Sequence, residues 1–255
     1  MTRLLIVPAA GLGSRLQAGA PKALVPVGGR PMIDRLIEIC RPHVDRVLVV
    51  AHPSFSADVR ARLDAGWSDR VGCEVVEQPA PTGMLDAILL GLPAAERQRP
   101  ERIWTIWCDQ VGVLPETLAR LAAAEDARPV PDLVFPTVPQ RNPYIHFPRD
   151  ATGRIVDVLQ RRERDDMPQD GESDMGLFAL SRDAYCRLLP EFARESGLGV
   201  GTGERNFLPF IPWLAARASV ATIPCTDPRE AVGINTPEEL RAVEAWLVQR
   251  APGTA

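Results

Sequence analysis

Two glycines and two basic side chains lie close together near the start of the chain. Gly11 and Gly13 follow an apolar run, Arg15 comes two positions later, and the pair Pro21-Lys22 follows. Glycine lets a backbone approach a ligand closely and exposes its N–H groups. Such N–H groups bind phosphate oxygens, and Arg15 and Lys22 bring two positive charges to the same place. The pattern predicts a polyphosphate cradle at the carboxyl end of a first strand.

Two better-known phosphate loops do not fit this segment. A P-loop needs a Gly-Lys-Ser/Thr tripeptide four residues after a first glycine, whereas Lys22 follows a proline. A dinucleotide-binding loop needs a third glycine, and Leu16 stands at that position. The spacing therefore argues against both types of loop. The remaining alternative is an ordinary glycine turn, which is disfavoured because the strand, the glycines, the arginine and the Pro-Lys pair occur together.

The segment resembles the signature of the sugar-phosphate nucleotidyltransferases, which is Gly-x-Gly-x-Arg followed by Pro-Lys. The resemblance implies an α/β fold with a Rossmann-like, mostly parallel sheet, helices on both faces and a smaller β-rich section that binds the sugar. It also implies that the loop grips the triphosphate of a nucleotide, with Arg15 and Lys22 as catalytic cations. The implied nucleotide-binding residues of the loop are Ala10, Gly11, Gly13 and Ser14.

Residues 78–83 (QPAPTG) form the next matching segment. They resemble the family segment Gln-Pro-x-Pro-x-Gly, which faces the base in thymidylyltransferases and uridylyltransferases. A glutamine amide carries an acceptor and donors, so Gln78 can pair with the N3–H and O4 edge of uracil or thymine. Gly83 lets the backbone approach the base or ribose, and Thr82 belongs to the same nucleotide-binding set. A proline-rich turn with a polar tip is the structural alternative.

Asp109 follows the apolar run Trp104–Cys108, which overlaps the strand expected over Arg102–Trp107. A carboxylate there lies at the edge where open α/β sheets bind ligands. The resemblance implies that Asp109 holds a catalytic Mg²⁺ and that Asn235, in the late motif GINTP, supplies a second protein oxygen. Mg²⁺ prefers such hard oxygen ligands and shares them with substrate phosphates. Cys108 stands where the family usually has glycine, and a helix-capping role is the alternative for both ligands.

The acceptor side is expected at Glu172, Asp174 and Gly176, in a segment (ESDMG) that resembles the family's Glu-x-Asn-x-Gly. In the family these groups hold sugar hydroxyls. An ionised Asp174 only accepts hydrogen bonds, whereas the usual amide also donates, and this change can alter the preferred sugar. Arg161 or Arg162 can replace the lysine that usually binds the sugar phosphate, since guanidinium binds phosphate well. A solvated basic turn is the alternative for the arginines.

Strands and helices alternate in the first half of the chain. Short apolar runs bounded by turn residues predict strands, and apolar spacings of three and four residues predict helices. The predicted strands are Leu4–Val7, Arg46–Ala51, Cys73–Glu77 and Arg102–Trp107. The predicted helices are Pro31–Cys40, Ser54–Ala65 and Met84–Leu92. This alternation predicts a mostly parallel sheet with helices on both faces.

After about residue 130 the pattern becomes richer in strands. The strands expected there are Leu133–Thr137, Tyr144–Pro148, Ile155–Leu159 and Gly176–Leu180. The late helices are Arg205–Arg217 and Pro237–Gln249, and the second begins with a capping-box pattern at Thr236. We expect one domain over residues 1–255. Its parts are a nucleotide-binding half at about 1–130, an acceptor-binding and lid section at about 131–235, and a C-terminal helix at 236–250.

The composition is that of an ordinary globular protein, with 45% hydrophobic and 24% charged residues and a formal charge of -4. The slightly acidic balance argues against a general nucleic-acid binder. The five cysteines include no Cys-x-x-Cys pair, so the sequence predicts neither a zinc site nor a disulfide framework. The early apolar run is too short for a signal peptide and no run reaches membrane-spanning length, so we expect no membrane partner and a cytoplasmic location.

Together the segments predict an Mg²⁺-dependent nucleotidyltransferase that joins an NTP to a sugar 1-phosphate and releases pyrophosphate. The amide of Gln78 favours UTP or dTTP. Two alternatives stay open: a related transferase whose acceptor is a non-sugar phosphate or phosphonate, and a non-catalytic nucleotide-binding subunit of the same fold. The expected partners are the two small-molecule substrates, with no nucleic acid and no membrane, and a homo-oligomer is left open.

Overall fold

The computed structural model describes residues 1–11, 13, 16, 20–67 and 69–250 of the chain. A mixed sheet runs through these residues in the order β10-β7-β11-β6-β1-β4-β5, and β12 pairs with β7. The strands are β1 (Arg3–Ala9), β4 (Arg46–Ala51), β5 (Gly72–Glu77), β6 (Arg102–Ile106), β7 (Leu133–Arg141), β10 (Asp170–Asp174), β11 (Leu177–Ser181) and β12 (Val220–Pro224). Strands β5, β4, β1 and β6 run parallel, whereas β11 is antiparallel to both of its neighbours. The predicted mostly parallel α/β sheet is confirmed.

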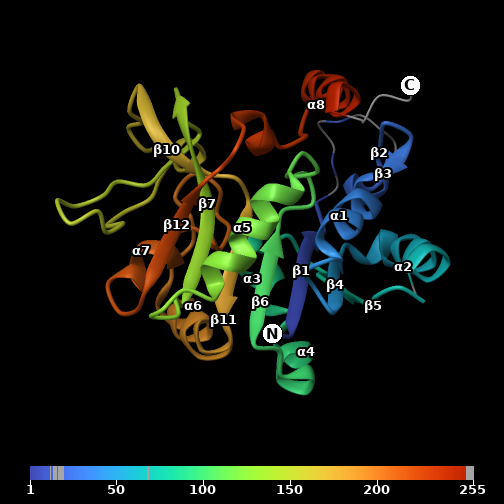
Figure 1. The fold of residues 1–255 in the computed structure, drawn as a ribbon, viewed down its shortest axis with the longest axis horizontal. Helices are drawn as coiled ribbons and strands as arrows, with labels where there is room; N and C mark the ends of the chain where they lie inside the picture. The colour runs from blue at the N-terminus through green and yellow to red at the C-terminus, as the bar shows by residue number, and fades with distance from the viewer. Residues whose placement is uncertain (12, 14–15, 17–19, 68, 251–255) are drawn as a thin grey trace.

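Helices cover both faces of this sheet, and the alternation of side chains along β1 shows how. Leu5 and Val7 pack into one core with α1, α2, α5 and α8, whereas Leu4 and Ile6 pack into a second core with α3, α4, α6 and α7. In Figure 1, α5 lies in front of the sheet and α3 behind it. The helices are α1 (Met32–Cys40), α2 (Pro53–Trp67), α3 (Met84–Leu89), α4 (Leu92–Gln98), α5 (Pro115–Glu125), α6 (Leu189–Glu195), α7 (Phe210–Ala215) and α8 (Pro237–Arg250).

Short elements complete the described chain. Two small ribbons lie off the main sheet, one made by β2 (Pro26–Val27) and β3 (Arg30–Pro31), the other by β8 (Ile145–His146) and β9 (Leu159–Gln160). Single helical turns are η2 (Lys22–Leu24), η3 (Arg161–Glu163), η4 (Ala184–Leu188) and η5 (Pro228–Ala231). Among the described residues, none of the helices combines the length and apolar character needed to cross a membrane.

The carboxyl ends of the parallel strands share one edge of the sheet. The chain leaves β1 after Ala9, β4 after Ala51, β5 after Glu77 and β6 after Ile106 at this edge. Figure 1 shows the N-terminus at the opposite edge, while the chain entering α8 lies on the carboxyl side. Open α/β sheets bind ligands at this carboxyl edge. The fold therefore gathers the segments that follow four different strands into one place.

The predicted helix over Arg205–Arg217 is wrong in its first part, because α7 begins only at Phe210. The Arg205 N–H donates to the Thr82 carbonyl at 2.8 Å, and the Arg205 carbonyl accepts from the Leu85 N–H at 3.2 Å. These long-range bonds use the backbone groups that a helix would need, so tertiary pairing overrides local propensity.

Two predicted strands are also shorter than expected. The segment Tyr144–Pro148 contributes only β8, and Ile155–Leu159 contributes Leu159 to β9 and one bridge between Ile155 and Arg149. Pro143 and Pro148 flank β8, and proline cannot donate to a ladder of strands. By contrast, the predicted capping box of α8 is confirmed, since Thr236 and Glu239 each accept a backbone N–H of the other at 3.2 and 2.9 Å.

Candidate active site

Folding brings three predicted residues from distant parts of the chain into direct contact. The Lys22 ammonium donates to Asp109 Oδ2 at 2.6 Å and to Asn235 Oδ1 at 2.8 Å. Lys22 begins η2, Asp109 follows β6, and Asn235 directly precedes the cap of α8. The Ile234 N–H also donates to the Asp109 carbonyl at 3.2 Å, which joins the two segments through their backbones. We call Lys22, Asp109 and Asn235 the cation cluster.

Local structure fixes the members of the cation cluster. The α8 capping box holds Asn235, because Glu239 Oε2 accepts the Asn235 N–H at 2.7 Å in addition to that of Thr236. Gly13 has a φ of +61°, and a Cβ added there would lie 3.3 Å from Lys22 Cβ. A residue with a side chain would be strained at Gly13 and would press on Lys22. The glycine loop therefore positions Lys22 by close backbone approach.

Part of the predicted phosphate loop is described by the structure. Ala10 and Gly11 line a cavity at the carboxyl end of β1, and Gly13 lies against Lys22. The predicted residues Ser14 and Arg15 lie outside the described residues.

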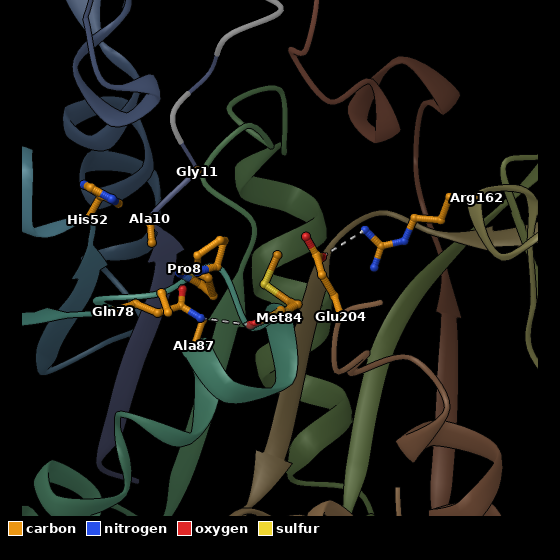
Figure 2. A pocket seen from close by; sticks show the side chains of 12 residues that line it. Pro8, Ala10, Gly11, His52, Gln78, Met84, Ala87, Arg162 and Glu204 are labelled. Carbon is orange, nitrogen blue, oxygen red and sulfur yellow. Dashed lines mark hydrogen bonds and ion pairs between the residues drawn. The ribbon is translucent and has the colours of Figure 1, made fainter. Parts of the chain in front are cut away.

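The cavity has two facing walls. Figure 2 shows Gln78 with the end of β1 on one side, and Glu204 with Arg162 on the other. An adjoining hollow shares Pro8, Gly11 and Met84 with this cavity. That hollow extends to further residues, namely Ala9, Lys22, Trp107, Cys108 and Asp109. The shared residues join the two hollows, whose combined lining runs from Gln78 to Lys22 and Asp109 of the cation cluster.

Gln78 is almost fully buried in the cavity wall, with an exposed fraction of 7%. Its side-chain amide donates to the Gly83 carbonyl at 3.1 Å and lies 3.4 Å from Thr82 Oγ1. These contacts close the turn over residues 78–83 and hold the side chain in place. Gly83 has a φ of +119°, and a Cβ there would lie 2.3 Å from the Arg205 carbonyl oxygen. Only glycine fits this approach, so the turn and Arg205 are packed backbone to backbone.

The structure distinguishes the two candidate arginines of the acceptor side. Arg162 lines the cavity and lies 3.9 Å from Glu204 Oε2. Arg161 instead donates to the Pro143 carbonyl at 3.0 Å and to the Asn142 carbonyl at 3.4 Å, so its guanidinium supports the β8 segment. Of the two, only Arg162 faces the space between the walls.

The turn that carries Arg162 is tied to the loop that carries Glu204. Glu163 accepts from the Gly201 N–H and from Thr202 Oγ1, both at 2.7 Å. The buried Asn206 side chain donates to Gln160 Oε1 at 2.7 Å on the other side of the same turn. This network fixes η3 against residues 199–206 and therefore orients Arg162 toward Glu204.

The remaining predicted acceptor residues occupy different surroundings. Glu172 forms a two-pronged ion pair with Arg149, with contacts of 2.6 and 2.7 Å. None of Glu172, Asp174 and Gly176 is among the described residues that line the two hollows. Asp174 ends β10 and accepts the Gly176 N–H at 2.8 Å. Gly176 has a φ of +66°, and a Cβ there would lie 2.3 Å from the Trp107 ring. Gly176 therefore allows the chain around Asp174 to pack beside the strand end that carries Asp109.

Burial raises the pKa of Asp174 to about 6, and the nearby carboxylate of Asp109 adds to this effect. Because the folded state holds the proton more tightly than the unfolded state, stability falls as the pH rises from the ordinary value of 3.8 through about 6. We expect Asp174→Asn to remove this loss while keeping an oxygen for the Gly176 N–H. Urea unfolding between pH 4.5 and 8 should show the variant gaining stability over the wild type up to about pH 7. A constant difference across this range would contradict the prediction.

Cys108 stands where the family usually has glycine. Burial raises the pKa of its thiol to about 12, so the thiol stays protonated at neutral pH. Its side chain packs in the core beneath the cation cluster, with an exposed fraction of 5%. The departure from glycine is accommodated by packing and leaves the Asp109 carboxylate directed at Lys22.

Two polar residues of the cavity, His52 and Glu204, are not among the site residues predicted from the sequence. His52 directly follows β4 and accepts the Ser54 N–H at 3.2 Å through Nδ1, at the start of α2. Its position after a parallel strand is the signal that could have placed it at the ligand edge. Glu204 lies on a loop between α6 and α7, at the end of the segment Gly201-Thr202-Gly203-Glu204, whose pattern is only a weak signal for a substrate-side loop.

The cation cluster has the donor chemistry that a divalent metal needs. An ammonium already stands between a carboxylate oxygen and an amide oxygen, and these are the hard ligands that Mg²⁺ prefers. Next to Asp109, the buried Gln110 Oε1 has no hydrogen-bond partner among the described residues. A buried acceptor of this kind calls for a donor such as an ordered water. Asp109 and Asn235 therefore fit a cation that also takes ligands from a substrate.

Comparison with known proteins identifies the family of the chain. Residues 5–172 match the family described as the MobA-like NTP transferase domain. Three curated relatives carry the name Bifunctional protein GlmU. The relative from Xylella fastidiosa is 25% identical over 252 residues (97% of this chain, 52% of the relative). Those from Alkalilimnicola ehrlichii and Paracoccus denitrificans are 27% identical over 250 residues (97% and 51%) and 32% identical over 258 residues (98% and 54%).

The chain spans about half the length of these curated relatives. The family match itself covers more than half of the chain and includes the glycine loop, Lys22, the Gln78 turn and Asp109. Enzymes of this family generally use a divalent metal. The chain belongs to the MobA-like NTP transferase domain family, and the comparisons support the predicted sugar-phosphate nucleotidyltransferase family.

Proposed function

We propose that the protein transfers a nucleotidyl group from UTP or dTTP to a sugar 1-phosphate, with Mg²⁺ as the metal, and releases pyrophosphate. The observation that carries the proposal is the pair of joined hollows between Gln78 and the cation cluster, with Arg162 on the facing wall. One end offers an amide that suits a base, the other offers charges that suit phosphates. Arg162, on the facing wall, offers a cation for a second phosphorylated substrate.

The chemistry needs positioning and charge more than proton transfer. A phosphate oxygen of the acceptor attacks the α-phosphorus of the nucleotide, and the bond from that phosphorus to the β-phosphate oxygen breaks. The nucleophile is already an anion, so no general base is required. Lys22 and Arg15 neutralise charge that develops on the phosphates, helped by the N–H groups of the glycine loop. Asp109 and Asn235 would hold the Mg²⁺, which polarises phosphate oxygens when bound.

Gln78 is the residue that we assign to the base. Its amide is oriented by Gly83 and is part of the cavity wall, so it is rigid before any ligand binds. A rigid amide can read the N3–H and O4 edge of uracil or thymine at little entropic cost. Ala10, Gly11 and Thr82 complete this side of the proposed nucleotide site.

We assign the acceptor phosphate to Arg162 and the acceptor hydroxyls to Asp174 and to the backbone at Gly176. Glu172 is engaged by Arg149, so its part in the site would be to hold the end of β10 that carries Asp174. The carboxylate of Asp109 contributes to the raised pKa of Asp174, which supports assigning acceptor groups to the neighbourhood of the metal ligands.

The neighbouring arginines provide a matched pair of variants. We expect Arg162→Ala to raise the KM for the acceptor by about 10-fold to 100-fold, since a charge-assisted hydrogen bond is lost. The KM for the nucleotide should change little. Arg161→Ala removes the same side chain one residue away, from a site that supports β8, and should leave both KM values within about threefold. Equal effects of the two substitutions would contradict the assignment of Arg162.

Pyrophosphate release tests the proposed function directly. The assay combines Mg²⁺ and each of UTP, dTTP, CTP, GTP and ATP with a panel of sugar 1-phosphates and of other phosphorylated acceptors. We expect release with UTP or dTTP and one sugar 1-phosphate. Release only with a non-sugar phosphate or phosphonate would identify the related transferase instead. Nucleotide binding by folded protein without release from any acceptor would favour the non-catalytic alternative.

A further inference from the structure

We propose that the Lys22 ammonium occupies the cation position of Asp109 and Asn235 until a metal binds, and that the metal then displaces it toward the nucleotide phosphates. Lys22 would thus act twice, first as a stand-in cation and then as a phosphate ligand. The inference rests on the proposed function only in taking Asp109 and Asn235 as the metal ligands.

The contacts of Lys22 carry the first step. One nitrogen atom bonds to Asp109 Oδ2 at 2.6 Å and to Asn235 Oδ1 at 2.8 Å. These are the two oxygens that the metal would use, and both side chains of the ion pair are largely buried, with exposed fractions of 14% and 15%. Two cations that share the same pair of oxygens would repel each other strongly in such partly dry surroundings. A metal bound at these same two oxygens would therefore drive the ammonium away from them.

The residue type at position 22 suits such an exchange. Lys22 is the only lysine in the 255-residue sequence, in which every other residue of the 29 basic ones is arginine. A lysine ammonium is a compact point charge on a flexible stem, whereas a guanidinium is a planar fork that holds two oxygens at once. The single lysine is therefore found at the one described position where a basic side chain bridges the predicted metal ligands.

The surroundings of Lys22 anchor its backbone and leave movement to the stem. The Cβ of Lys22 packs on Gly13, and the neighbouring Ala23 is fully buried. The adjoining hollow is lined by Lys22 together with Gly11 and Pro8 of the predicted phosphate side. Rotation of the stem would carry the ammonium from the two oxygens into this hollow, where the nucleotide phosphates are expected.

The charges set the direction of the exchange. In the cation cluster, one ammonium balances the single carboxylate of Asp109, since Asn235 is neutral. If a divalent ion bound to the same oxygens, the charge of the Lys22 ammonium would no longer be balanced by the Asp109 carboxylate. The triphosphate of a nucleotide offers the nearest compensating negative charge, so metal and nucleotide together favour the displaced position of Lys22.

Metal affinity measured without any acceptor tests the exchange. We expect Lys22→Met, which keeps a stem of similar length, to bind Mn²⁺ about 10-fold more tightly than the wild type in calorimetric or spin-resonance titrations, because no ammonium has to be displaced. Arg162→Met is the matched control, since it removes a positive charge from the same space without contact to the two oxygens. Its Mn²⁺ affinity should stay within about threefold of the wild type.

Three outcomes of this titration would overturn the proposal. These are an unchanged or weaker Mn²⁺ affinity of Lys22→Met, an equal gain in both variants, and no Mn²⁺ binding by either the wild type or Lys22→Met. A thermal unfolding curve confirms beforehand that each variant is folded. None of these results depends on the identity of the acceptor, so a failure of the exchange is distinguishable from a failure of the proposed transferase reaction.

The single lysine also gives a direct spectroscopic readout. Protein labelled with ¹³C at the lysine side chain should give one Cε signal for the whole chain. We expect this signal to shift when Mg²⁺ is added to the wild type, and to stay in place when Mg²⁺ is added to Asp109→Asn. A Lys22 signal that does not move at Mg²⁺ concentrations that saturate the wild type would rule out displacement.

Discussion

Asp109→Asn is expected to lower kcat for pyrophosphate release by about a thousandfold, because several kcal/mol of stabilisation by the metal are lost. The substitution keeps the shape of the side chain and one oxygen for Lys22. It removes the only negative charge in the cation cluster, so neither the metal nor the ammonium retains a charged partner there. The measurement is the initial rate at saturating Mg²⁺, nucleotide and acceptor.

The variant should remain folded, which separates a catalytic effect from a structural one. The Ile234 N–H bonds to the backbone carbonyl of Asp109, and this contact does not depend on the side chain. Asp183→Asn serves as the control, because it makes the same chemical change in an exposed ion pair with Arg187. Its rate should match that of the wild type. A rate for Asp109→Asn within about threefold of the wild type would exclude Asp109 as the metal ligand.

The sequence identifies the members of the cation cluster because each one stands next to a recognisable local feature. Asp109 follows a strand, Lys22 follows a glycine loop and Asn235 precedes a capping box. Parallel strands place their carboxyl ends at one edge, so a common location can be predicted for the segments after β1 and β6. The direct contact of Lys22 with Asn235 cannot be predicted in this way, because 213 positions separate them and only the folded chain sets the distance.

The acceptor side is less predictable, because its residues are distinguished by contacts rather than by type. Arg161 and Arg162 are identical neighbours, and only the carbonyl groups of Asn142 and Pro143 decide which one turns away from the cavity. Glu172 likewise carries a carboxylate of the kind that accepts hydrogen bonds from a sugar, yet Arg149 donates to both of its oxygens. The orientation of each of these side chains depends on partners that are distant in the sequence, so it cannot be predicted from a local pattern.

Arg205 shows the same limit for secondary structure. Its neighbourhood reads as the start of a helix, but its backbone pairs with Thr82 and Leu85. Its guanidinium also forms an ion pair with Asp86 of α3 at 2.6 Å. The segment is therefore not helical at Arg205, because its backbone is attached to the turn that contains Gln78. This attachment links the proposed base-binding and acceptor-binding parts of the site through backbone hydrogen bonds.

Gly83→Ala is expected to break this link, with a loss of about 100-fold in kcat/KM and of about 2–6 kcal/mol in the free energy of unfolding. The new Cβ would lie 2.3 Å from the carbonyl oxygen and 2.6 Å from the nitrogen of Arg205, at a φ of +119°. Strained backbone costs about 1–3 kcal/mol and overpacking costs about 1–3 kcal/mol more. A displacement of about 1 Å between bound substrates is enough to cost roughly 100-fold in rate. Steady-state kinetics and urea unfolding measure the two effects.

Gly153→Ala separates backbone strain from the collision with Arg205. Gly153 also has a positive φ, of +84°, but a Cβ there would meet nothing within 4 Å. It should cost only the strain of about 1–2 kcal/mol and leave kcat/KM unchanged. If Gly83→Ala behaved in the same way, the pairing with Arg205 would be structural only. The other outcome is a large loss of kcat/KM in Gly83→Ala under conditions where the variant is still folded. It would mean that the nucleotide turn and the acceptor loop must keep their relative position for transfer to occur.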